Sequence, residues 1–163
     1  MELLRAEGEY EPYTTFRRMT EIYFSDFAGG NQSAIAAMID FYGGAGTFVS
    51  WPPRVRAYVE QTTPVNILDW ATAYAYPLSA ALLANIRIPA LIIRGGASHP
   101  AMQRANALLS ERIGDSKLST IDGAAHFMIA THADELAQLI AHHVGAIHRE
   151  FTGSREGVYQ PFR

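Results

Sequence analysis

Thr120-Ile121-Asp122-Gly123-Ala124-Ala125-His126-Phe127 is the stretch that decides the fold of this 163-residue chain. An apolar, β-branched run ends at Ile121, a turn of small residues follows, and one histidine is delivered at the end of the turn. Gly123 can adopt a positive φ, and the two alanines keep the turn narrow. An imidazole has an unperturbed pKa of about 6.5, so His126 is suited to proton transfer at neutral pH. The simpler interpretation is a loop histidine bonded to the backbone.

Two segments beside this turn have the pattern of parallel strands. The first is Pro89-Ala90-Leu91-Ile92-Ile93-Arg94, a nearly all-apolar run that ends in Gly95-Gly96 and is typical of a strand buried on both faces of a sheet. The second strand is predicted at residues 117–121, after an amphipathic helix at 100–113. A last helix is expected from Thr131 or His132. Strand, helix, strand and helix at these lengths indicate a βαβ unit with a closing helix.

Residues 1–87 have the pattern of helices, whose ends are marked by glycine, proline and capping residues. Helices are predicted from Thr14 or Thr15 to Gly29-Gly30, from Asn31 to Gly43-Gly44, from Pro52-Pro53 to about Gln61, after Pro64, and from Ser79 to Asn85. Most aromatic side chains of this half are expected to form its core. Trp51, Trp70 and Tyr74 lie near predicted turns, where they could line a cleft.

The composition is that of a globular chain, with 48% hydrophobic and 18% charged residues. A net charge of −3 argues against nucleic acid or an anionic membrane as a partner. The absence of cysteine excludes disulfides, thiolate metal sites and a cysteine nucleophile. No apolar run is long enough to cross a bilayer, and the acidic N-terminus does not resemble a signal peptide. We therefore expect a cytoplasmic protein.

The segment from Pro89 to Met128, with the helix that follows it, resembles the C-terminal end of α/β-hydrolase-fold enzymes. In that family the last two strands deliver the acid and the histidine of a catalytic triad. The resemblance implies an α/β fold with a helical lid at residues 1–87. The C-terminal βαβα part of a hydrolase sheet is expected at 88–150, and a polar tail at 151–163. It also implies hydrolysis of an ester or related acyl bond, with His126 as the catalytic general base.

The other members of a triad are not found in the chain. The loop where the family places its acid, Gly95 to Pro100, contains no carboxylate, and a hydroxyl such as that of Ser98 cannot carry the charge that stabilises an imidazolium. The same loop imitates a G-x-S-x-G nucleophile elbow around Ser98. However, Pro100 replaces the last glycine, and only one strand separates Ser98 from His126. The simpler interpretation is that Ser98 or His99 caps the next helix.

We therefore expect the C-terminal part of a hydrolase that is inactive alone, with its serine nucleophile upstream of Met1. Two parallel strands do not form a stable sheet, so we expect an incomplete sheet and self-association through its unpaired edge. The expected substrate is small and apolar or ester-like. The alternative is a complete, non-catalytic binding or interaction module derived from the same fold.

No cofactor is predicted, because the sequence has neither a phosphate-binding glycine loop nor a useful cluster of metal ligands. Asp134, Gln138 and His142 share one face of the last predicted helix and could mimic metal ligands. A solvated polar face explains them better. The candidate acids Asp40, Asp69, Asp115 and Asp122 are all poorly placed to orient His126.

Overall fold

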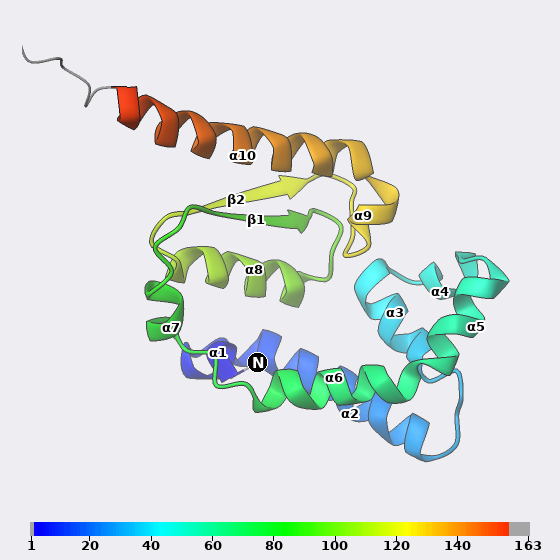
Figure 1. Cartoon of the computed structure of the whole chain (residues 1–163). Helices are drawn as coiled ribbons and strands as arrows, with labels where there is room; N and C mark the ends of the chain where they lie inside the picture. The colour runs from blue at the N-terminus through cyan, green and yellow to red at the C-terminus, as the bar shows by residue number, and fades with distance from the viewer. Residues whose placement is uncertain (1, 157–163) are drawn as a thin grey trace, which may run out of the picture.

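The computed structural model describes residues 2–156, which form helices around a small parallel sheet of two strands (Figure 1). The helices before the sheet, which we call the helical part (residues 2–84), are α1 (Glu2–Ala6), α2 (Tyr10–Ala28), α3 (Ile35–Gly43), α4 (Thr47–Ser50), α5 (Pro53–Gln61), α6 (Thr63–Ala75) and α7 (Ala80–Ala84). The elements after them are β1 (Ala90–Gly95), α8 (Pro100–Arg112), β2 (Ser116–Ile121), α9 (Met128–Thr131) and α10 (Ala133–Glu156). This combination agrees with the predicted α/β class.

The two strands pair in parallel, in a register that runs from Ala90 opposite Ser116 to Gly95 opposite Ile121. The predicted βαβ unit is therefore confirmed. α8 lies on one face of the sheet and α10 crosses the other face (Figure 1). Because the strands are parallel, the loop after β1 and the turn after β2 emerge at the same edge of the sheet.

The strands are less buried than the sequence predicts. Leu91, Ile92 and Ile93 are only half-buried, whereas their apolar run is typical of a strand covered on both faces. On α10, the apolar side chains of Ile140 and Val144 remain 47% and 57% exposed. A sheet of two strands is too narrow to cover the apolar face of the helix that crosses it.

The core of the chain lies between α8 and the helical part. Phe16 and Tyr23 of α2 and the buried face of α3 pack in one cluster with Ala101 and Leu108 of α8. α8 therefore contacts the sheet on one side and α2 on the other (Figure 1). This shared core connects the helical part to the sheet.

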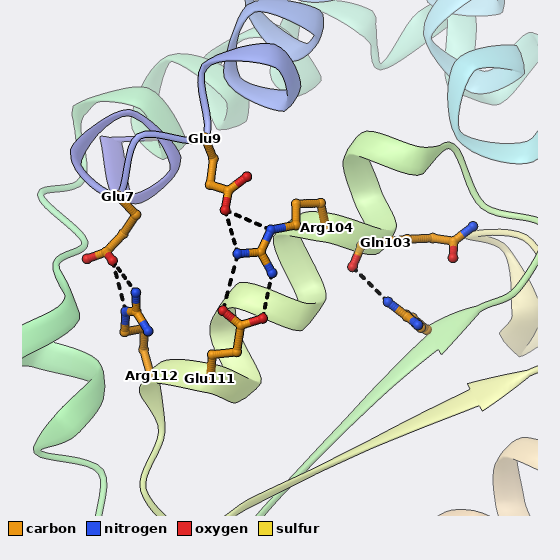
Figure 2. A network of polar contacts seen from close by, with 7 residues as sticks. Glu7, Glu9, Gln103, Arg104, Glu111 and Arg112 are labelled. Carbon is orange, nitrogen blue, oxygen red and sulfur yellow. Dashed lines mark hydrogen bonds and ion pairs between the residues drawn. The ribbon is translucent and has the colours of Figure 1, made fainter.

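Ion pairs also hold the link between α1 and α2 against α8 (Figure 2). Arg104 donates through Nε to Oε1 of Glu9 at 2.8 Å and through Nη1 to Oε1 of Glu111 at 2.5 Å. Arg112 donates through Nε to Oε2 of Glu7 at 3.0 Å. The hydrogen bond from Arg104 holds the pKa of Glu9 below its usual value. The link is therefore attached by charge as well as by the apolar core.

Several predicted helix ends are confirmed and three are wrong. α5 runs from Pro53 to Gln61, as predicted, and Ser79 caps α7 by accepting a hydrogen bond from the amide of Leu82 at 3.3 Å. α2 begins at Tyr10 rather than at Thr14 or Thr15, so Thr14 lies inside the helix, where its Oγ1 donates to the carbonyl of Tyr10 at 2.6 Å. α3 begins at Ile35 rather than directly after Asn31, whose Oδ1 accepts from the amide of Ser33 in the turn before the helix.

At the other end of the chain, α10 continues to Glu156, although the sequence predicts a polar tail from residue 151. A helix already running through 133–150 adds further residues at little cost, because each new turn needs no nucleation. The rest of the predicted tail, 157–163, lies outside the described residues.

Candidate functional site

The turn that carries His126 packs directly against the loop that follows β1. The amide of Ala97 donates to the carbonyl of Ala124 at 2.8 Å, and Ala124 is fully buried. A Cβ atom on Gly95 would lie only 2.2 Å from that same carbonyl oxygen. Gly123 adopts φ +73°, as its place in the turn predicts. The two loops therefore form one closely packed unit at the carboxyl edge of the sheet.

Helix α3 positions the histidine at the end of this turn. The amide of His126 donates to the carbonyl oxygen of Tyr42 at 3.3 Å. The imidazole lies with its centroid 4.7 Å from the ring of Tyr42 and 5.4 Å from that of Phe127. Contacts from the helical part and from its own turn thus lie against part of the ring, whereas the residue as a whole remains exposed.

Desolvation lowers the pKa of His126, and among residues 2–156 no carboxylate contributes to the shift. A pKa below about 6.5 keeps the imidazole neutral at pH 7, which is the form that accepts a proton. In a complete triad a carboxylate would orient the ring and stabilise its charged form. The described residues therefore supply a base without the acid partner.

His126 forms part of the wall of a cavity of about 390 Å³ between the helical part and α8. The wall is largely apolar and aromatic, and its residues are Ile35, Met38, Ile39, Tyr42, Trp51, Val59, Thr62, Asn66, Trp70, Met102, His126 and Phe127. A cavity of this volume is in the range of small-molecule sites. The prediction that Trp51 and Trp70 line a cleft is confirmed. Tyr74 lies outside this wall, and its hydroxyl bonds with that of Thr20 at 2.7 Å.

A second cavity, of about 570 Å³, lies on the other side of Trp51 and Phe127. These two rings meet edge to face at 5.0 Å and belong to the walls of both cavities. The second cavity is larger, but His126 is not part of its wall. The larger cavity has a histidine of its own, His132, in its wall. We take the cavity of 390 Å³ as the candidate site because its histidine, His126, is the one at the carboxyl edge of the sheet.

Ser98 is buried, at 6% exposure, and lies in the wall of neither cavity. Its carbonyl accepts a hydrogen bond from Gln103 Nε2 at 2.9 Å, which ties the loop to α8. His99 caps α8, since its Nδ1 accepts from the amide of Ala101 at 3.1 Å. The imidazole of His99 also stacks on Phe41 at 4.4 Å. The capping interpretation is thus confirmed for His99 rather than for Ser98.

The carboxylates considered from the sequence have other surroundings. Asp40 accepts hydrogen bonds from the amides of Gly46 at 3.1 Å and Phe48 at 2.8 Å, so it holds the start of α4. Asp69, Asp115 and Asp122 are exposed. Asp134, Gln138 and His142 are exposed too, as expected of a solvated face. Within the part of the chain that the structure describes, no three acidic or histidine side chains are grouped to hold a metal ion.

Two residues of the site have roles that the sequence did not predict. Tyr42 is a buried residue of α3, and it contacts His126 through both its backbone and its ring. Asn66 lines the cavity and accepts a hydrogen bond from the hydroxyl of Tyr23 at 3.1 Å. In the sequence, Asn66 is visible only as a polar residue between the apolar positions of α6, which does not indicate a place in a cavity wall.

No protein-family model, curated protein or solved structure matches this chain. Across residues 2–156, no helix has both the length and the apolar character that crossing a lipid bilayer requires.

Proposed function

We propose that this chain carries the lid and the histidine-bearing end of an α/β-hydrolase-type enzyme that cleaves ester or related acyl bonds. One observation carries the proposal. His126 follows the second of two parallel strands and borders an apolar cavity that is built largely by the preceding helices. A base at the carboxyl edge of the sheet and a covering set of helices are the parts that such an enzyme needs next to its substrate.

In this reaction the neutral imidazole of His126 takes the proton of a serine hydroxyl as the serine attacks the acyl carbon. It then returns the proton to the leaving group. We assign the nucleophile and the acid to polypeptide outside residues 1–163. Ser98 does not suit the role, because it is buried and borders neither cavity.

The second candidate function is a non-catalytic binding module, and a specific observation favours it. Desolvation alone shifts the pKa of His126, and no carboxylate among the described residues orients its ring. In that case the cavity binds a ligand, and the histidine serves only as part of its wall.

The experiment starts from the DNA directly upstream of the codon for Met1. A reading frame continuous with this chain, with β-strand patterns and a G-x-S-x-G segment, is expected for the hydrolase. The polypeptide encoded by that longer frame should hydrolyse p-nitrophenyl acetate, whereas the 163-residue chain alone should not. An upstream stop codon next to a ribosome-binding site would favour the binding module instead.

Variants of the longer polypeptide assign the roles. His126→Ala should lower kcat by about 10²- to 10⁴-fold, the usual contribution of general acid–base catalysis. Ser98→Ala is the matched control and should leave kcat unchanged, because Ser98 lies in neither cavity wall. Hydrolysis that persists in His126→Ala, or that disappears in Ser98→Ala with the fold intact, would overturn these assignments.

A further inference from the structure

We propose that the cavity beside His126 binds a small, uncharged aromatic molecule that carries one hydrogen-bond acceptor. As a statement about the substrate, this inference rests on the proposed function, since it names the class of acyl compound to be cleaved. As a statement about binding it stands on the walls of the cavity alone, and it applies to a binding module as well.

The aromatic walls favour a planar ligand. The chain contains two tryptophans, Trp51 and Trp70, and both line this cavity. The ring of Tyr42 lies 6.1 Å from that of Trp70, at an interplanar angle of 29°. Phe127 stands edge to face with Trp51, at 77°. The cavity thus offers aromatic rings of several orientations, and an aromatic ligand can stack on one while meeting the edge of another.

The walls also exclude charge. None of the described residues that line the cavity is Asp, Glu, Lys or Arg, and desolvation lowers the pKa of His126. A charged ligand would lose its hydration without gaining a counter-ion. The ligand is therefore neutral at physiological pH.

Asn66 is one of the polar residues of the wall, with Tyr42, Thr62 and His126, and it offers the ligand a donor. Its Oδ1 already accepts the hydroxyl of Tyr23 at 3.1 Å, so its amide NH₂ is the group left to donate. The nearby hydroxyl of Thr62 donates to the carbonyl of Tyr58 at 2.9 Å. A carbonyl oxygen on the ligand would accept from Asn66, as the carbonyl of an aromatic ester or ketone can.

The test uses three ligands of similar shape and the ¹⁵N-labelled chain. Acetophenone has the ring and the carbonyl, ethylbenzene has the ring alone, and benzoate adds a charge. The indole N–H signal of Trp70 reports on this cavity alone, whereas that of Trp51 reports on both cavities. Acetophenone should move both signals with one common dissociation constant. Ethylbenzene should bind on the order of fivefold more weakly, the effect of one hydrogen bond, and benzoate should move neither signal.

A variant tests the donor. Asn66→Asp keeps an oxygen that accepts from Tyr23 but removes the NH₂ group. The variant should therefore bind acetophenone on the order of fivefold more weakly than the unmodified chain does. Ethylbenzene does not use the donor, and its binding shows whether the cavity of the variant is intact. Val65→Ala, at an exposed position of the same helix, should leave both affinities unchanged.

The proposal is overturned if acetophenone leaves the indole signal of Trp70 in place, or if ethylbenzene binds the unmodified chain as tightly as acetophenone does. Both results are measured on the unmodified chain, so they do not depend on whether the Asn66→Asp variant folds. Failure of the proposed function has a different signature: both indole signals move, but the longer polypeptide shows no ester hydrolysis that depends on His126.

Discussion

The amide of His126 donates to the carbonyl oxygen of Tyr42 at 3.3 Å, and the rings of the two residues lie 4.7 Å apart. One hydrogen bond and one ring contact therefore join α3 to the turn after β2. Burial also raises the pKa of the Tyr42 phenol, so this ring remains neutral beside the imidazole. The helical part thus sets both the position of the histidine and the polarity around it.

The first prediction concerns the protonation of His126. Because desolvation lowers its pKa, the imidazole of the folded chain should titrate below about 6.5. Tyr42→Ala uncovers one side of the ring and should move the midpoint back toward that value. The measurement is an NMR titration of the imidazole C–H signals, with the urea-unfolded chain as the reference. A midpoint at or above that of the unfolded chain would contradict the account.

The same shift predicts how stability depends on pH. The unfolded chain binds the proton of His126 more readily than the folded chain does, so folding is favoured above about pH 6.5. Stability should fall as the pH decreases from there through the lowered pKa of the folded state. Urea unfolding at a series of pH values measures this slope, and His126→Gln should make it shallower. An unchanged slope in the variant would assign the effect to other groups.

A second prediction concerns the contact between the two loops. Gly95→Ala would place a Cβ atom 2.2 Å from the carbonyl oxygen of Ala124, and this backbone cannot move without disturbing the turn. We expect a loss of about 1–3 kcal/mol in the free energy of unfolding, measured with urea. Gly96→Ala is the matched control, because its Cβ atom would approach no atom closer than 3.4 Å. Equal effects of the two substitutions would argue against the packed arrangement.

A third prediction concerns the ion pairs on α8 (Figure 2). Arg104 bonds both Glu9 and Glu111, so Arg104→Met should loosen the link between α1 and α2. Hydrogen exchange of the amides in residues 7–13 should become faster, while exchange in β1 should not change. Arg54→Met, on the exposed side of α5, is the control. The effect should shrink at high salt, since ions screen partly exposed pairs. Unchanged exchange in residues 7–13 of the Arg104 variant would contradict this prediction.

A fourth prediction concerns the sheet. Within the described residues, β1 and β2 pair only with each other, and Ile140 and Val144 of α10 are exposed. We expect the isolated chain to self-associate, in a concentration-dependent way, in size-exclusion chromatography. Ile140→Lys combined with Val144→Lys should reduce the association. A sharp monomer peak of the unmodified chain at high concentration would contradict the expectation.

Elements with local signals could be predicted from the sequence. Proline, glycine and serine mark the ends of α5 and α7, and apolar runs mark the two strands. α4 was not predicted, because its start depends on the carboxylate of Asp40, which bonds the amide of Phe48 from another helix. The half-buried strands also could not be foreseen, since their burial depends on how much sheet lies beside them.

The candidate site, too, could be predicted only where its residues form a local sequence pattern. The turn of His126 and the glycine at residue 123 were visible as a local pattern. The contact with Tyr42 joins residues far apart in the chain, and no local pattern indicates it. Most aromatic side chains of the helical part were expected to form a core, and a cleft was expected only near Trp51, Trp70 and Tyr74. The sequence could not show that a cavity of about 390 Å³ there would be bordered by His126.

The central claim is that His126 acts as the general base of an acyl hydrolase. The most direct test is the initial rate of p-nitrophenyl acetate hydrolysis by the polypeptide of the longer reading frame, compared with its His126→Ala variant at the same concentration. The account predicts hydrolysis that falls by about 10²- to 10⁴-fold in the variant. Equal rates for the two proteins would contradict it.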